Sequence, residues 1–177
     1  LDSSDVIIPY ATLINKDGDA NNPKGNLILP GGQVIKGFPT ADGEAGEYLE
    51  GVSILNIQPV RVYFPEKFNA NNSYICRSTD GRTGTDGEYA GRACSECEFA
   101  KYPEEGGASP CRDQRLLLCA TKDTVFQLII SGVGMRVFRE FISQQMMKTL
   151  PSVKNLWLAL NLDLHIKVVE TENGKFA

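Results

Sequence analysis

The sequence has little of the chemistry that enzymes use at their active sites. It contains one histidine, His165, in 177 residues, and no serine or cysteine nucleophile is visibly paired with it. Gly132 and Gly134 follow a predicted strand and open a predicted helix, but the lysine of a P-loop and the third glycine of a dinucleotide-binding loop are missing. The acidic residues are scattered and suggest no acid–base pair. We therefore expect that the protein is not an enzyme.

Long apolar runs are also missing. No run approaches the roughly 20 residues that a membrane-spanning helix needs, and no signal-peptide pattern opens the sequence. These absences favour a cytoplasmic protein without a membrane partner. Hydrophobic residues make up 42% and charged residues 23% of the chain, which is normal for a globular protein and excludes a wholly disordered one.

The charge is unevenly distributed. The formal net charge is −4, which argues against strong non-specific binding of nucleic acid. Residues 1–60 carry three Lys/Arg and eight Asp/Glu, whereas residues 61–154 carry 13 Lys/Arg and 11 Asp/Glu. An anionic partner would therefore meet the middle of the chain, mainly through arginine.

Apolar runs between turn residues predict a mainly β fold with one helix. The helix is expected over 134–150, where apolar residues recur at three- and four-residue spacings, and it ends before Pro151. The predicted strands lie in residues 5–14, 26–37 (a hairpin around Pro30-Gly31-Gly32), 51–65, 112–120 and 124–131.

The strongest periodic signal is near the end of the sequence. From Leu156 to Val168, seven apolar residues alternate with polar ones without a break, which predicts one strand of roughly 45 Å with a single buried face. A strand of that length usually curls around a barrel or a sandwich. We therefore expect a small OB-like β-barrel that carries one α-helix.

The stretch from Lys67 to Pro110 has a different composition, because Gly, Asn, Ser, Asp and Cys dominate it. An irregular loop of this length is improbable in a compact domain unless something other than an apolar core holds it. We expect residues 67–111 to form a zinc-binding insertion in a barrel domain made of residues 1–66 and 112–177.

Four of the five cysteines bound this segment, with the spacing Cys76-x17-Cys94-x2-Cys97-x13-Cys111. The two-residue gap lets two sulfurs point at one ion, and the other two thiolates complete a tetrahedron. This pattern predicts a structural Zn²⁺, since four thiolates leave no position for water. The alternatives are a disulfide pair or free thiols, and the odd cysteine count weakens the disulfide reading. Cys119 lies in an apolar strand and is expected in the core.

Aromatic residues and arginines occur where a core does not demand them. On a small barrel, such residues hold single-stranded nucleic acid through phosphate contacts and base stacking, and each stacked base contributes roughly 1–3 kcal/mol. The alternative is that the aromatics pack under the helix or around the metal. The candidate nucleic-acid contacts are Arg61, Tyr63, Arg77, Arg82, Arg92, Arg112, Arg115 and Trp157.

The cysteine segment resembles that of a known family. Its motifs are Cys76-Arg77-Ser78-Thr79-Asp80-Gly81-x-x-Gly84, Gly91-x-x-Cys94-x-x-Cys97 and Pro110-Cys111. They are similar to those of uncharacterised bacteriophage and prophage proteins, and residues 128–144 resemble the same family more loosely. By analogy, the chain resembles zinc-containing OB-fold single-stranded DNA-binding proteins of phages.

This resemblance implies a protein that binds single-stranded DNA, without sequence preference, during phage or mobile-element replication or recombination in a bacterial host cell. Replication or recombination proteins would be its further partners. The alternative function is a zinc-stabilised protein-interaction or accessory module that binds no nucleic acid.

Overall fold

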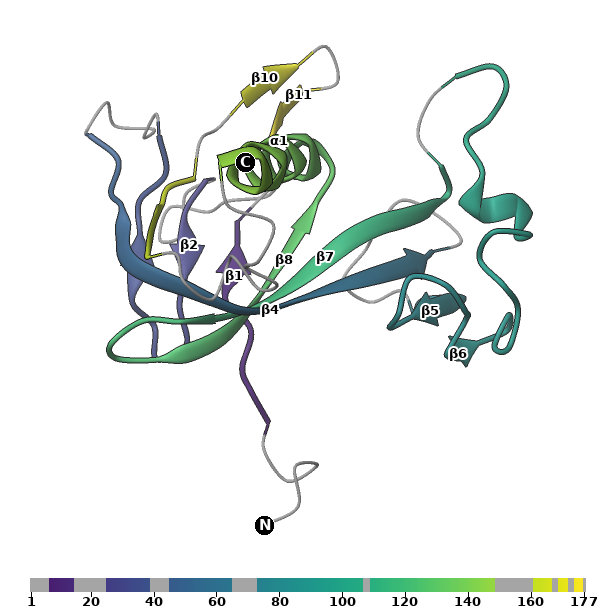
Figure 1. The fold of residues 1–177 in the computed structure, drawn as a ribbon, viewed down its shortest axis with the longest axis horizontal. Coiled ribbons are helices and arrows are strands. Elements are labelled where there is room, and N and C mark those ends of the chain that lie inside the picture. Colours follow the sequence, from purple (N-terminus) through teal and green to yellow (C-terminus); the bar gives the residue numbers. More distant parts are fainter. Residues whose placement is uncertain are drawn as a thin grey trace. The chain divides into compact units, whose positions relative to one another are not determined.

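The computed structural model describes residues 7–14, 25–38, 45–64, 73–106, 109–148, 161–166, 169–171 and 174–176. The fold is mainly β, with antiparallel strand pairs and one α-helix (Figure 1), as the sequence predicts. The strands are β1 (Thr12–Leu13), β2 (Leu27–Ile28), β3 (Val34–Ile35), β4 (Leu49–Tyr63), β5 (Cys76–Ser78), β6 (Asp86–Gly87), β7 (Cys111–Ala120), β8 (Val125–Ser131), β9 (Leu162–Leu164), β10 (Val169–Thr171) and β11 (Gly174–Phe176). The α-helix α1 covers Val133–Lys148, and a 3₁₀ turn covers Glu98–Ala100.

The described strands form three sheets, and none of them closes into a barrel. β1, β2 and β3 form one sheet, and β10 pairs with β11. The largest sheet has the order β6-β5-β4-β7-β8, with β9 paired to β4. The predicted OB-like barrel is therefore wrong for this part of the chain. Closure would need the two end strands, β6 and β8, to pair with each other. These two strands do not pair among the described residues.

Only part of the predicted strand from Leu156 to Val168 lies among the described residues, where Leu162–Leu164 form β9 and residues 161, 165 and 166 are not in a strand. Residues 156–160 and 167–168 lie outside the described residues. β9 has three residues and pairs Leu164 with Leu49 and Leu162 with Val52. Beyond it, the carbonyl of Ile166 accepts a hydrogen bond from the N–H of Phe38 at 2.7 Å. Alternation in a sequence shows which face is buried, but it does not supply a partner strand.

The predicted hairpin, the two strands that precede the helix and the helix itself are confirmed. β2 and β3 are antiparallel with Leu27 opposite Ile35, and Gly31 and Gly32 have φ values of +92° and +89° at the turn. Such angles suit glycine because it has no Cβ. The strands predicted at 112–120 and 124–131 are β7 and β8, and the predicted helix is α1. Among the described helices, none is long and apolar enough to cross a membrane.

The residues gather into two compact units. Unit 1 comprises Leu1–Asn56, Leu117–Leu128 and Phe141–Ala177, and unit 2 comprises Ile57–Leu116 and Ile129–Glu140. Unit 2 is larger than the predicted insertion of residues 67–111, since it also contains the second half of β4 and the start of α1.

The two units differ in how much apolar surface they bury. The buried apolar side chains of unit 1 are Ala11, Leu27, Leu29, Ile35, Leu49, Val52, Ile54, Leu117, Cys119, Phe126 and Leu128. Among the described residues of unit 2, only Val60, Cys111 and Met135 are buried hydrophobic ones. The cysteine-rich unit thus has little apolar core of its own, as its composition predicts.

Candidate metal centre

Three neighbouring strands position the first part of the site. β4 lies between β5 and β7, and Figure 1 shows this arrangement where β5 and β6 lie beside β4. Cys76 opens β5 and Cys111 opens β7. Cys76 therefore lies on one flank of β4 and Cys111 lies on the other.

The register of β4 and β5 decides which side chains accompany Cys76. Tyr63 lies directly opposite Cys76, and Arg61 lies opposite Ser78. Residues two apart on a strand share a face, and directly opposed residues share it too. Arg61, Tyr63, Cys76 and Ser78 therefore project from the same face of the sheet, which is the face that carries the site.

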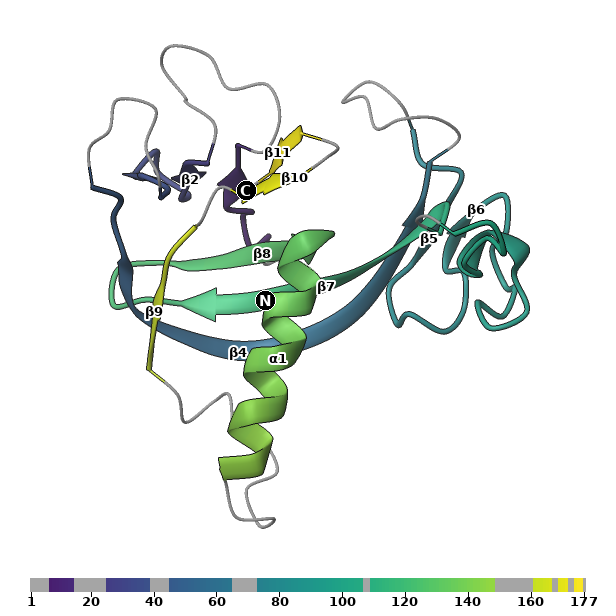
Figure 2. The same cartoon turned by 90° about the horizontal axis from the view of Figure 1, so that it is seen from above.

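A compact turn positions the other two cysteines. The N–H of Cys94 donates to the carbonyl of Arg82 at 2.6 Å, and the N–H of Cys97 donates to the carbonyl of Cys94 at 3.3 Å. The 3₁₀ turn follows, and the N–H of Ala100 donates to the carbonyl of Cys97 at 3.1 Å. Both cysteines of the Cys94-x-x-Cys97 pair thus lie on one short, hydrogen-bonded turn, the knuckle. The ribbon of this segment lies beside β5 and β6 (Figure 2).

All four cysteines line one pocket within unit 2. All five cysteines of the chain are free thiols, so the disulfide alternative is not what the structure contains. The other residues that line the pocket are Arg61, Tyr63, Ser78, Gly84, Tyr89, Arg92, Phe99 and Ala100.

The thiols affect one another's ionisation. Burial raises the pKa of Cys76, and the nearby Cys94 and Cys97 raise it further. Burial raises the pKa of Cys111 to about 11; Arg61 opposes this rise, whereas the other three cysteines add to it. Without a cation, the thiols of Cys76 and Cys111 are therefore neutral at pH 7.

Cys119 is separate from this group. It is 1% exposed in β7, and burial alone raises its pKa to about 12. It does not line the pocket. The prediction that Cys119 is a core residue is confirmed.

The pocket has the donors for a metal, but its thiols do not form a closed cluster. In the described part of the chain, no three cysteine, histidine or acidic side chains stand close enough to hold an ion. The donor set fits Zn²⁺, which four thiolates bind in a tetrahedron. Gly84 leaves space for a sulfur, because a Cβ there would lie 3.2 Å from Cys76 Sγ and would overlap the carbonyl oxygen of Tyr89.

Three aromatic side chains, Tyr63, Tyr89 and Phe99, line the pocket. The rings of Tyr63 and Phe99 stack with centroids 4.5 Å apart and planes at 16°, and Tyr89 meets Phe99 at 5.4 Å. The guanidinium of Arg92 lies 5.7 Å from the centre of the Tyr89 ring. Tyr63 and Tyr89 therefore pack around the cysteines. The sequence leaves this packing open as the alternative to a role in binding nucleic acid.

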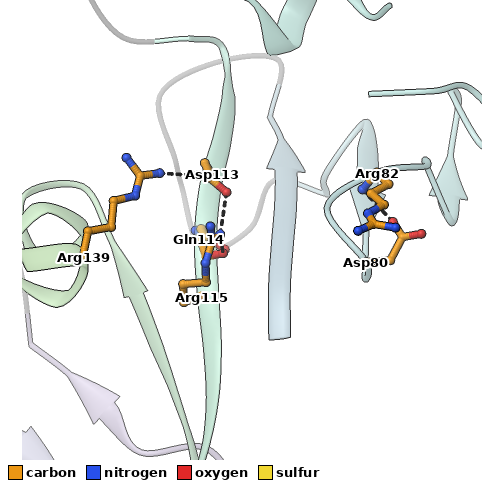
Figure 3. Close-up of polar contacts among 6 residues, drawn as sticks. All are labelled: Asp80, Arg82, Asp113, Gln114, Arg115 and Arg139. Carbon is orange, nitrogen blue, oxygen red and sulfur yellow. Dashed lines mark hydrogen bonds and ion pairs between the residues drawn. The ribbon is translucent and has the colours of Figure 1, made fainter. Parts of the chain in front are cut away.

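The remaining candidate nucleic-acid contacts are dispersed. Arg77 is partly buried, whereas Arg82 and Arg112 are exposed. Arg115 forms an ion pair with Asp113 at 2.8 Å, and Asp113 also binds Arg139 of α1 at 2.7 Å (Figure 3). Trp157 lies outside the described residues.

Asp80 is a structural residue to which the sequence alone assigns no role. Its Oδ1 accepts a hydrogen bond from the N–H of Arg82 at 2.7 Å (Figure 3). The same oxygen also accepts hydrogen bonds from the N–H of Thr83 at 2.8 Å and from Ser78 Oγ at 2.9 Å. These bonds, led by that of Thr83, lower the pKa of Asp80. An Asp-Gly pair before the knuckle is the signal that could have identified this turn.

We expect Asp80→Asn to destabilise this turn in a pH-dependent way. The folded-state pKa of Asp80 is lowered, so its contribution to stability is complete above its ordinary value of 3.8 and disappears as the pH falls through the folded value. The difference in free energy of unfolding between wild type and Asp80→Asn should therefore be present at pH 7 and shrink below about pH 4. Urea unfolding of both proteins at each pH measures it.

The control for this prediction is Asp123→Asn, because Asp123 is an exposed aspartate in the turn between β7 and β8. The prediction would be contradicted if, at neutral pH, Asp80→Asn lowered the free energy of unfolding no more than Asp123→Asn does. It would also be contradicted if the loss in Asp80→Asn stayed the same in acid.

Comparison of the chain with family models, with curated proteins and with solved structures finds no match.

Proposed function

We propose that this protein is a zinc-stabilised module that binds single-stranded DNA. One observation supports the metal above all: four thiols from β5, β7 and the knuckle line a single pocket. They do so in a unit with only three buried hydrophobic residues among those described. Because metal binding energy becomes folding energy in such a unit, a bound ion would explain how it holds its structure.

Zinc is the ion that the donors favour. A site of four soft sulfur ligands suits Zn²⁺ or an iron–sulfur centre, and the single two-residue knuckle is typical of structural zinc. Cys76, Cys94, Cys97 and Cys111 would be the ligands. Binding would release their protons and bring the sulfurs to about 2.3 Å from the ion. No position for substrate or water would remain, so the role of the ion is structural.

Exposed cations and rings on unit 2 support DNA as the partner. Arg82 and Arg112 are exposed, and Tyr102 is 72% exposed beside the knuckle in sequence. Guanidinium groups meet phosphates, and exposed rings stack on bases. Arg61, Tyr63, Arg92 and Arg115 are occupied in the pocket or in ion pairs. Arg82 and Arg112 are therefore the best-placed contacts among the candidate arginines.

A fluorescence titration with oligo-dT at two salt concentrations tests this function. Each phosphate contact that is lost lowers the dependence of log K on log salt by about 0.7 for a single strand. We therefore expect Arg82→Ala and Arg112→Ala each to weaken binding and to lower the slope by about that amount. Arg136→Ala is the control, since Arg136 is an exposed arginine of the same unit whose ion pair is with Glu140, at 3.9 Å.

A second function is favoured by the acidic residues of the same segment. Glu88, Glu96, Glu98, Glu104 and Glu105 are all exposed, and carboxylates repel phosphates while they attract basic protein surfaces. Zinc-loaded protein that binds no oligo-dT even at low salt would exclude the DNA function and leave the protein-interaction module.

A further inference from the structure

The pocket contains a cation whose position suits the metal better than it suits DNA. Arg61 lies on β4, the strand between the one that begins with Cys76 and the one that begins with Cys111. It is opposite Ser78, which is 1% exposed, and it shares its face with Tyr63 and Cys76. Arg61 therefore lies on the sheet face that carries the site, where it lines the pocket and is partly buried.

The charge of the loaded site calls for such a cation. Four thiolates and one Zn²⁺ leave the centre doubly negative, and a negative charge in a partly buried pocket is unfavourable unless a positive group lies nearby. Arg61 and Arg92 both line the pocket. Arg92 is exposed and lies over the Tyr89 ring, so water screens its charge more than that of Arg61.

We propose that Arg61 is a positioning residue of the metal centre, which neutralises the tetrathiolate and raises its affinity for zinc, and that it does not contact DNA. The inference rests on the proposed zinc site and deepens it. Outer-shell partners of this kind typically change metal affinity by 10–100-fold.

Competition with a chromophoric chelator measures the zinc affinity of four proteins: wild type, Arg61→Gln, Arg61→Lys and Lys101→Gln. Arg61→Gln should bind zinc at least about 10-fold more weakly than wild type. Arg61→Lys keeps the charge and should recover most of the affinity. Lys101→Gln makes the same change of net charge at an exposed residue between Cys97 and Cys111 that does not line the pocket, and it should bind like wild type.

Cobalt substitution provides a readout that separates a changed site from a misfolded one. Co²⁺ bound by four thiolates gives intense visible bands, and Arg61→Gln should keep these bands at saturation while it needs more cobalt to reach them. If Arg61→Gln binds zinc as tightly as Lys101→Gln, or if Arg61→Lys is as weak as Arg61→Gln, the inference is wrong while the zinc site stands. Wild-type protein that binds no zinc would overturn the proposed site and the inference together.

Discussion

Removal of zinc is expected to unfold unit 2. A site that holds zinc at 1,000 times its Kd stabilises the folded state by about 4 kcal/mol, which is a large part of the roughly 5–15 kcal/mol of a typical domain. The described residues of unit 2 have few buried apolar side chains to replace this contribution. A chelator should therefore lower the unfolding midpoint strongly, and metal analysis should find one zinc per chain.

Hydrogen exchange locates the effect along the chain. Chelation should remove protection from the backbone amides of the knuckle, including the N–H groups of Cys94 and Cys97 that donate at 2.6 and 3.3 Å. The backbone amides around Leu27 and Phe126 in unit 1 should keep more of their protection from exchange, because the apolar core there needs no metal. Uniform loss along the chain would contradict this local role.

Two cysteine variants identify the ligands. Cys94→Ser should lose the zinc and the stability together, because it removes one of four donors. Cys119→Ala is the matched control, since it removes a thiol that is buried outside the pocket, and it should retain one zinc per chain. Protein whose stability does not change with a chelator would exclude the structural metal.

Local signals explain which parts of the fold the sequence could predict. Pro30-Gly31-Gly32 indicates a turn, and the two glycines adopt the positive φ angles that the turn needs. β7, β8 and α1 follow from runs whose period matches one element. The barrel prediction was wrong for a different reason. The alternation from Leu156 to Val168 does not show which strand this segment pairs with. Among the described residues, β9 pairs only with β4, at Leu49 and Val52.

The same distinction holds at the site. The spacing of the cysteines singles out the four that line the pocket, and the apolar run around Cys119 predicts that this fifth cysteine lies in the core. The sequence also places Arg61 and Tyr63 on one side of β4, but it does not tell which partner strand lies opposite. That pairing is long-range: β5 brings Cys76 to Tyr63 and Ser78 to Arg61. Without it, these two residues resemble an open nucleic-acid surface, whereas with it they line the pocket.

The core of unit 1 should respond to Phe126→Ala as strongly as the metal centre responds to a chelator. Phe126 lies on β8, is fully buried and is the largest such side chain among the described residues. Truncation of a buried Phe removes apolar contacts and leaves a cavity, which costs about 3–5 kcal/mol. Urea unfolding should show this loss as a lower midpoint with little change of slope.

Val125→Ala provides the contrast to this prediction, because Val125 is the preceding residue of the same strand and is 43% exposed. Its truncation should change the free energy of unfolding by less than about 1 kcal/mol, since an exposed side chain leaves no cavity. Equal losses in the two variants would mean that Phe126 is not at the centre of the core. Cobalt titration of Phe126→Ala while it is still folded should give the wild-type visible bands, since none of the four cysteines belongs to unit 1.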